Sequence, residues 1–330
     1  FIRPGDRVLL KPNLLVARSY RKPVTTHPSL VIAVITLVRE VGGEAVIGDS
    51  PAIGSALSVA KRCGILEMAE EMGVEVIGFT ESKEIEVPDG RTYRIVRVAK
   101  DVLDADVIIN LPKIKTHNLT LLTLAVKNLF GCVVGKGKSQ WHIRAAHDPS
   151  SFGRMLVELY LTIRPKLNIV DGIIGMEGAG PSNGDPRYLG LILAGEDAVA
   201  VDRVIQEILG VPLKAFSTII MAREIGAGET ELDKITIKGT PIEEARVNGF
   251  KLPSGAVARP QRFPPLLRRL LKRYLTPEPY IDHKKCTLCE SCIEICPPGV
   301  MSFTSRGRKE ESEKGCEHCC VQYVSRDHEA

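Results

Sequence analysis

The sequence predicts an α/β fold with a doubly wound, mostly parallel or mixed sheet, followed by a small cysteine-rich module. Three observations predict it. Short apolar runs alternate with longer helical patterns from residue 5 to about residue 240. The chain has 330 residues, which is enough for two domains, and seven of its nine cysteines lie in the last 45 residues.

Seven short apolar runs are the predicted strands. They are continuous rather than alternating, and helical patterns separate them, which indicates a sheet covered by helices on both faces. The runs occupy residues 8–10, 45–47, 74–79, 107–109, 167–170, 189–193 and 235–237. An interruption at residues 85–98, with Pro88-Asp89-Gly90 between two alternating segments, predicts a β-hairpin.

Six helical patterns lie between these runs, at residues 29–41, 55–72, 119–130, 152–163, 198–209 and 218–225. Residues that favour helix ends flank several of them. Pro28 suits a first helical turn, and Gly42 and Gly210 suit helix ends in the left-handed conformation. Asp197 or Glu196 suits the N-terminus of the helix that follows.

The composition is that of an ordinary globular protein, with 44% hydrophobic and 25% charged residues. A formal net charge of +4 is too small to indicate nucleic acid or an anionic membrane as a partner. No apolar run approaches the roughly 18 residues of a membrane-spanning helix. The chain opens Phe1-Ile2-Arg3, which indicates a fragment or a processed chain. We expect a cytoplasmic protein with no transmembrane segment and no nucleic-acid partner.

Residues 259–277 differ from the rest of the chain. Six Lys and Arg residues occur there with no acidic residue, prolines flank them, and the leucines between have helical spacing. We interpret the segment as a connector packed on the large domain, with a membrane-surface or partner-binding helix as the alternative. The expected organisation is an α/β domain at residues 1–258, a basic Pro-rich linker helix at 259–279 and a cysteine module at 280–330.

A C-x2-C-x2-C-x3-C-P run opens the cysteine module. Three thiolates at this spacing wrap around one corner of a 4Fe-4S cluster, and the fourth reaches a neighbouring cluster in two-cluster ferredoxins. A zinc ribbon would leave Cys292 and Cys296 without a role, and disulfides conflict with the lack of a secretory signal. The module is therefore predicted to be ferredoxin-like and to bind iron through Cys286, Cys289, Cys292 and Cys296.

The second half of the module is degenerate or truncated. It contains Cys316, Cys319 and Cys320. A symmetrical ferredoxin would have further cysteines where Gln322 and Arg326 stand. One cluster is therefore expected and a second is possible, held by these three cysteines and Cys296. The first three cysteines would then hold a three-iron cluster or a four-iron cluster with another ligand. A frame error near codon 324 is a different explanation of the tail.

Polar residues collect where four of the predicted strands end. In open α/β sheets the carboxyl ends of the strands line the ligand crevice, so these residues predict a polar pocket. Turn formation alone is the alternative, although lysine is a poor turn residue. The candidate residues, with two histidines from neighbouring loops, are Lys11, Asn13, His27, Asp49, Lys113, His117 and Asp171. The lysines favour an anionic small-molecule ligand.

Several neighbouring features have two interpretations. The Thr25-Thr26-His27-Pro28 loop is expected to cap a helix or bind an anion. The histidines and aspartates together with Glu177 would suit a metal site or acid/base chemistry.

The glycine-rich loops give no nucleotide-binding motif. Residues 135–139 do not form a phosphate loop, because Cys132 stands where that motif needs glycine, so we expect a mobile basic loop or an anion-binding lid. No G-x-G-x-x-G motif follows a strand, so a nicotinamide site has no support. Residues 175–181 are expected to be a flexible loop over the crevice. Cys63 and Cys132 are expected to be structural.

Several motifs resemble, in their order along the chain, the bacterial and archaeal family called domain of unknown function 362. They are Lys11-Pro12-Asn13, Thr25-Thr26-His27-Pro28, Gly48-Asp49-Ser50-Pro51, the run from Asn110 to His117, Lys127-Asn128, and Asp171-Gly172 through Gly180-Pro181. The resemblance implies a C-terminal ferredoxin-type module, which many members carry. The absent last Cys-Pro departs from that pattern. The Thr-Thr-His-Pro and Gly-Asp-Ser loops are also faintly similar to the N-terminal domain of lactate-racemase-like proteins, as a fold-level analogy.

These features predict an iron–sulfur redox protein. Its C-terminal module would pass single electrons to or from an anionic ligand on the α/β domain, as in an iron–sulfur oxidoreductase with a redox partner protein. One alternative is a non-enzymatic electron carrier or a metal- or cofactor-assembly protein. Another is a redox-neutral enzyme with a structural cluster.

Overall fold

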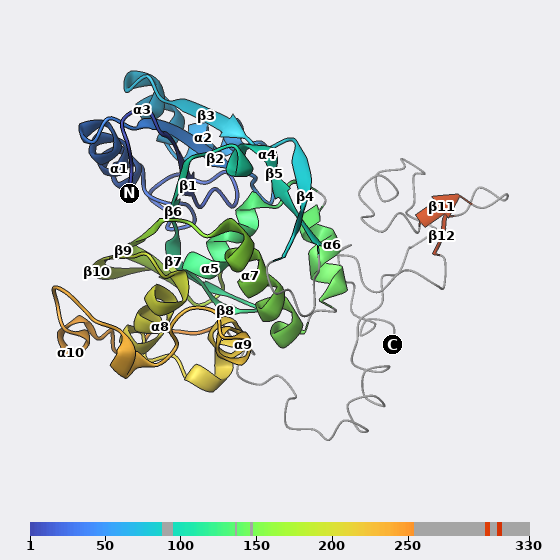
Figure 1. The fold of residues 1–330 in the computed structure, drawn as a ribbon. Helices are drawn as coiled ribbons and strands as arrows, with labels where there is room; N and C mark the ends of the chain where they lie inside the picture. The colour runs from blue at the N-terminus through green and yellow to red at the C-terminus, as the bar shows by residue number, and fades with distance from the viewer. Residues whose placement is uncertain (88–94, 136, 146–147, 254–300, 304–308, 312–330) are drawn as a thin grey trace. The chain divides into compact units, whose positions relative to one another are not determined.

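The computed structural model describes residues 1–87, 95–135, 137–145, 148–253, 301–303 and 309–311. The chain divides into two compact units, residues 1–138 with 148–257 and residues 139–147 with 258–330. The predicted linker at 259–279 and the seven cysteines of the C-terminal module lie outside the described residues. In the second unit, β11 (Met301–Phe303) and β12 (Lys309–Glu311) form an antiparallel pair (Figure 1).

The first unit is built on a sheet of eight strands, one half of which is parallel. In spatial order this half contains β3 (Glu75–Gly78), β2 (Glu44–Asp49), β1 (Arg7–Pro12) and β6 (Val107–Leu111), and every pairing among them is parallel. Strands covered on both faces need consecutive apolar residues, and Val8, Leu9 and Leu10 are fully buried. The predicted α/β fold with a mostly parallel, mixed sheet is confirmed.

The long strand β9 (Leu167–Glu177) connects the two halves of the sheet. It pairs in parallel first with β6 and then with β7 (Lys113–His117), which follows β6 after Pro112. β10 (Asp185–Gly195) pairs with β9 antiparallel, and β8 (Leu121–Thr123) pairs with β7 antiparallel. The ends of β1 and β2, the start of β7 and the middle of β9 therefore come to one region of the sheet.

Three helices cover one face of the parallel half. α1 (Pro28–Glu40), α2 (Ala56–Arg62) and α3 (Ile65–Glu71) share an apolar core with alternate residues of the strands. Val8 and Leu10 of β1 and Ile47 of β2 are fully buried in this core. The buried residues of α1 recur at helical spacing, which is the pattern of a helix with one face in the core.

Several helices pack together beside the second half of the sheet (Figure 1). They are α5 (Ala125–Asn128), the 3-10 turn η1 (Leu129–Cys132), α7 (Pro149–Ile163), α8 (Ala198–Ile208) and α9 (Ser217–Ile225). The remaining elements are β4 (Ser82–Glu86), β5 (Ile95–Ala99), α4 (Lys100–Leu103), α6 (Gly137–Arg144), η2 (Leu213–Ala215), η3 (Leu232–Lys234) and α10 (Ile242–Ala245). The β-hairpin expected at residues 85–98 is confirmed, since β4 and β5 pair antiparallel.

Four expectations are wrong in detail. Residues 55–72 form two helices, because Gly64 between them adopts a φ of +79°. Residues 119–130 form β8 and short helical turns, because Leu121 has a φ of +65° and pairs with β7. Residues 235–237 form no strand and pack near α8 instead. The start of the expected loop at 175–181 continues β9, where Gly175 pairs with β10.

Candidate anion-binding site

Lys11 and Asp49 form a buried ion pair where β1 and β2 end. Lys11 Nζ lies 2.8 Å from Asp49 Oδ1, and the two side chains are 1% and 4% exposed. Parallel pairing of the strands brings the residues together. Asp49 also accepts hydrogen bonds from the backbone N–H groups of Leu14 and Ser50, which satisfy the carboxylate in its buried position. Gly131 lies against this pair, since a Cβ there would overlap both charged groups.

A second buried pair joins Lys113 to Asp171. The two residues are partners in the β7–β9 register, and Lys113 Nζ donates to Asp171 Oδ2 at 2.8 Å. The same oxygen accepts the backbone N–H of His27 at 2.8 Å. Burial lowers the pKa of Lys113, and Asp171 opposes that shift. Burial also lowers the pKa of His27, although Asp171 raises it.

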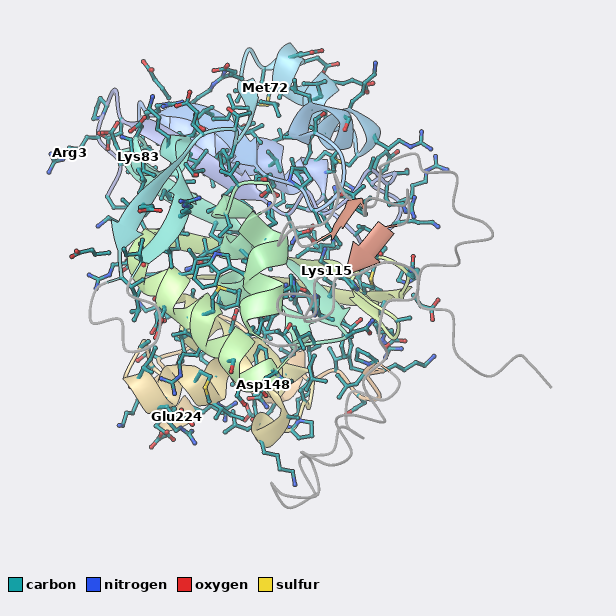
Figure 2. The ribbon with its side chains drawn as sticks, turned by 90° about the vertical axis from the view of Figure 1, so that its right-hand side faces the viewer. Arg3, Met72, Lys83, Lys115, Asp148 and Glu224 are labelled. Carbon is teal, nitrogen blue, oxygen red and sulfur yellow. The ribbon has the colours of Figure 1, made fainter. Side chains whose placement is uncertain are left out.

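Lys115, which is labelled in Figure 2, has neutral hydrogen-bond partners. Its Nζ donates to Asn13 Oδ1 at 2.8 Å and to the carbonyl of Val24 at 2.6 Å, and the residue is 1% exposed. Within the described part of the chain, no carboxylate forms an ion pair with it. Burial lowers the pKa of Lys115 well below its ordinary value. The charges of Lys127 and other nearby lysines lower it further, and the charge of Asp49 opposes the shift.

Four buried asparagines continue from Lys115 as one chain of hydrogen bonds. Asn13 Nδ2 donates to Asn128 Oδ1, Asn128 Nδ2 to Asn110 Oδ1, and Asn110 Nδ2 to Asn168 Oδ1, each at 2.8 Å. Asn168 Nδ2 then donates to the carbonyls of Gly195 and Glu196. Each of the four asparagine side chains has its amide oxygen on the side nearer Lys115 and its NH₂ group on the far side. The negative ends of the four dipoles therefore all point toward Lys115 and favour a positive charge on its ammonium group.

Two further lysines lie near these pairs. Lys127 Nζ lies 5.6 Å and 5.5 Å from the ring centres of Phe130 and Phe152. Burial lowers the pKa of Lys127 to about 8. Lys138 donates to the carbonyl and the hydroxyl of Ser50, and burial lowers its pKa to about 8 as well. Lys127 acts electrostatically on Lys115, and Lys138 interacts with the Lys11–Asp49 pair.

We call Lys11, Lys113, Lys115, Lys127 and Lys138 the lysine cluster. Only two carboxylates, those of Asp49 and Asp171, form ion pairs with it in the described structure. Buried charge without a counter-charge is unfavourable, so a cluster with more bases than acids favours an anion as its missing partner. Lysine and backbone N–H groups are the donors that bind carboxylate and phosphate oxygens.

The candidate residues from the sequence differ in the roles they take. Lys11 pairs with Asp49, Lys113 with Asp171, and Asn13 binds Lys115. His27 contributes its backbone N–H, while its Nδ1 accepts from the N–H of Ser29 and so caps α1. His117 Nδ1 accepts from the N–H groups of Leu119 and Thr120, which closes the turn after β7.

The neighbouring expectations also have definite outcomes. His27, rather than either threonine, caps α1, and Thr26 Oγ1 links the backbones of Asn13 and Leu111 instead. Glu177 accepts the backbone N–H of Lys251, outside the lysine cluster. Among the described residues, no group of three or more His, Cys, Asp and Glu could hold a metal ion. The metal interpretation of these residues therefore has no support.

Sequence reasoning missed several residues of the site. The candidate list left out Lys115, Lys127, Asn110 and Asn128, which lie in the motifs that carry the family resemblance, and Lys138, which lies in the expected basic loop. Asn168 was not singled out at all. Asp202 was also missed. It is fully buried and accepts the first N–H groups of α5, which precede Lys127, and burial raises its pKa to about 8. Two-residue spacing could have revealed Lys115, because alternate residues of a strand share a face with Lys113.

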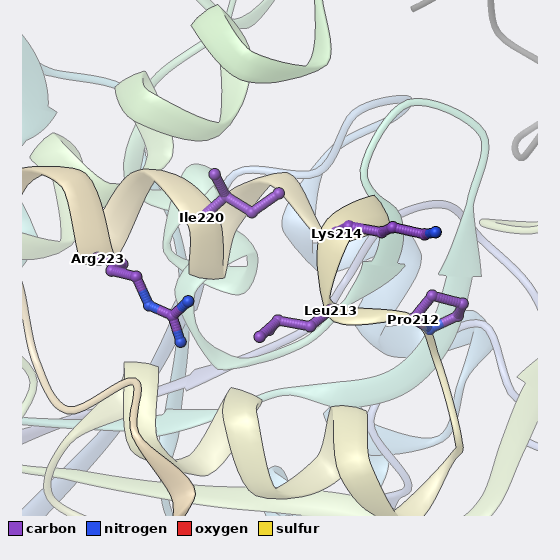
Figure 3. Close-up of a pocket in the computed structure, with 5 residues that line it drawn as sticks. All are labelled: Pro212, Leu213, Lys214, Ile220 and Arg223. Carbon is purple, nitrogen blue, oxygen red and sulfur yellow. The ribbon is translucent and has the colours of Figure 1, made fainter. Parts of the chain in front are cut away.

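The buried cysteines of the α/β unit have no ligand role in the structure. Cys63 and Cys132 are both fully buried, and burial raises the pKa of Cys132 to about 12. Such thiols are unreactive at neutral pH. A hollow of about 560 Å³ is lined by Pro212, Leu213, Lys214, Ile220 and Arg223 (Figure 3). None of these residues belongs to the cluster.

Residues 8–207 match the family described as Domain of unknown function (DUF362), and this region contains the whole lysine cluster. The chain belongs to the DUF362 family. Residues 279–302 of this DUF362 protein match the 4Fe-4S binding domain, and they include Cys286, Cys289, Cys292 and Cys296. The C-terminal module is therefore an iron–sulfur module, as its cysteine spacing predicted.

The DUF362 chain is also similar to individual proteins. It is 40% identical over 274 residues to the "Thylakoid-associated protein sll1697" of Synechocystis sp., covering 83% of this chain and 84% of that protein. A distant structural likeness is to the lactate racemase apoprotein from Thermoanaerobacterium thermosaccharolyticum, at 10% identity and a TM-score of 0.42. It covers 60% of this chain and 48% of the racemase. None of the described helices has the length and apolar character to cross a membrane.

Proposed function

We propose that this DUF362 protein is an iron–sulfur redox protein whose α/β domain binds an anionic small molecule at the lysine cluster. The C-terminal module would exchange single electrons with the ligand held there, and a redox partner protein would supply or remove them. The division into an α/β domain at 1–258, a linker helix at 259–279 and a module at 280–330 is part of the proposal.

The observation that carries the anion site is the charge of the lysine cluster. Five buried or half-buried lysines meet two carboxylates. Lys115, with no carboxylate partner in the described structure, is the clearest member. If the lysines served only to stabilise the fold, we would expect one carboxylate for each lysine. Each buried charge without a counter-charge lowers the stability of the folded protein by several kcal/mol. A bound anion would supply the missing charge and raise the pKa values of the lysines.

The electron-transfer part depends on the cysteine module. The donor set fits a 4Fe-4S cluster, because Cys286, Cys289, Cys292 and Cys296 have the C-x2-C-x2-C-x3-C-P spacing of thiolate ligands. Such a cluster supplies one-electron oxidation and reduction. We propose one cluster, with Cys316, Cys319 and Cys320 available for a second.

A cytoplasmic location is part of the proposal. Free thiolates for iron persist in a reducing compartment, which supports it. The name of the Synechocystis relative associates that protein with thylakoids. Fractionation of cells that express this chain therefore tests the location: recovery in the cytoplasmic fraction supports it, and recovery with membranes contradicts it.

Anaerobic reconstitution of the full chain tests the cluster. We expect brown protein with about four iron and four sulfide ions per chain, and an EPR signal after reduction. Cys286→Ser should lose most of the bound iron, whereas Cys63→Ala, which changes a core cysteine of the α/β unit, should retain it. Colourless protein that holds only zinc would overturn the proposal.

A second experiment tests the redox role. The reduced protein is mixed with candidate anions, and reoxidation is followed by the visible absorbance of the cluster. Reoxidation by one class of anion, lost in Lys113→Ala, supports the proposal. Reversible reduction with no response to any anion would contradict the substrate role and favour an electron carrier.

A further inference from the structure

One oxygen of Asp171 has no hydrogen-bond partner among the residues that the structure describes. The residue is 1% exposed, and its Oδ2 accepts from Lys113 Nζ and from the N–H of His27. Oδ1 of the same carboxylate is buried and accepts nothing in the described structure. A buried carboxylate oxygen without a donor is costly, so Asp171 Oδ1, which has no donor among the described residues, is an acceptor open to a ligand that can donate a hydrogen bond.

Asp49 provides the internal comparison. Its Oδ1 accepts from Lys11 Nζ and the N–H of Ser50, and its Oδ2 accepts from the N–H of Leu14. Both lysine–aspartate pairs are buried, but among the described residues only the Asp49 carboxylate has a donor for each of its oxygens. The difference is one acceptor, and it lies on the pair formed by Lys113 and Asp171.

We infer that the lysine cluster takes a hydrogen-phosphate group, whose P–O–H donates to Asp171 Oδ1 while lysines bind its other oxygens. This inference rests on the anion site proposed above and specifies its ligand class. An anion that meets a carboxylate must bring its own proton, because two oxygens without one repel each other. Inorganic phosphate keeps a P–O–H at neutral pH, and a phosphate monoester keeps one in part of its population, since its second pKa is about 6. Sulfate has the same shape but no proton to donate.

Isothermal titration of the reconstituted full chain at pH 7 and constant ionic strength tests this inference. The probes are inorganic phosphate, methyl phosphate and sulfate. We expect phosphate to bind at least about tenfold more tightly than sulfate, because sulfate would leave Asp171 Oδ1 unsatisfied against an oxygen. Methyl phosphate binding as well as phosphate would identify phosphate esters, whose organic part can exchange electrons, as ligands. Weaker binding of methyl phosphate would identify free phosphate; this also supports the inference, but it contradicts the redox part of the proposed function, because phosphate itself accepts no electron.

Two variants complete the experiment. Asp171→Asn offers an N–H to the ligand and should reduce the preference for phosphate over sulfate to less than about threefold. Asp49→Asn, in the matched pair, should leave the preference unchanged even if both affinities change. If either variant fails to fold, the preference of the unmodified protein decides.

The outcomes separate the inference from the proposed function. Equal affinities for sulfate and phosphate would overturn the hydrogen-phosphate inference and leave the anion site intact. Absence of binding by all three anions to folded protein would overturn both.

Discussion

Lys115 Nζ and Asn13 Oδ1 lie 2.8 Å apart in the interior of the α/β unit, and they join a buried lysine to a chain of four asparagines. An amide oxygen stabilises an ammonium group less than a carboxylate does, so this lysine has a weakly compensated charge. That arrangement suits a site whose counter-charge arrives with a ligand. The pKa of Lys115 is therefore a direct measure of how far the site compensates its positive charge.

Asn13→Asp should raise the pKa of Lys115 toward the ordinary value of 10.5, because it places a carboxylate at the position of the amide oxygen. In the unmodified protein, burial holds this pKa well below that value. NMR titration of the lysine side chains measures the change, and Lys115→Met assigns the signal. Titration of Lys115 near its ordinary value in the unmodified protein would show that the interior does not destabilise the charge.

Lys127→Met should make the protein more stable at pH 7 by roughly 1–2 kcal/mol, because removing a poorly solvated charge outweighs the loss of the cation–π contacts with Phe130 and Phe152. The folded-state pKa of Lys127 is about 8, below the ordinary 10.5. Between these two pH values the unfolded protein binds more protons than the folded protein. The contribution of Lys127 to the free energy of unfolding therefore rises with pH over this range. Chemical denaturation from pH 7 to 10.5 should therefore show the advantage of the variant shrinking. A constant difference across this range would mean that Lys127 does not titrate there.

Gly131→Ala should destabilise the protein by about 3 kcal/mol or more, because the new methyl group overlaps the Lys11–Asp49 pair. Gly78→Ala is the matched control, since its Cβ would meet only the Ala56 side chain at 3.5 Å. We expect that control to change stability by less than about 1 kcal/mol. Denaturant unfolding of both variants measures the contrast. Equal stabilities would indicate that the Lys11–Asp49 pair does not lie against residue 131 in solution.

Much of the fold could be predicted from local patterns. The strand at Val8–Leu10 and the helix after His27 follow from continuous apolar residues and from helical spacing. The segment after Pro112 could not be predicted in the same way. Its residues satisfy either helix or strand, and pairing with β9, distant in sequence, decides the outcome.

The sequence predicted those residues of the candidate site that directly follow a predicted strand. Lys11 and Asp49 follow from the rule that polar residues gather at the carboxyl ends of parallel strands. The same rule selected Lys113 and Asp171, although the structure places them at the start of β7 and within β9. Lys115 required the knowledge that its segment is a strand. Asn168 and Asp202 lie within apolar elements, and only the three-dimensional structure shows which backbone groups they bind.

The pH dependence of sulfate affinity tests the central claim most directly, since sulfate itself does not titrate between pH 6 and 10. Burial lowers the pKa values of Lys127 and Lys138 to about 8, so the cluster should lose positive charge above that pH. Isothermal titration of the reconstituted full chain should show saturable binding below pH 8 that weakens by at least about tenfold by pH 10. No saturable binding to folded protein, or an affinity that stays constant through pH 8, would contradict an anion site at the lysine cluster.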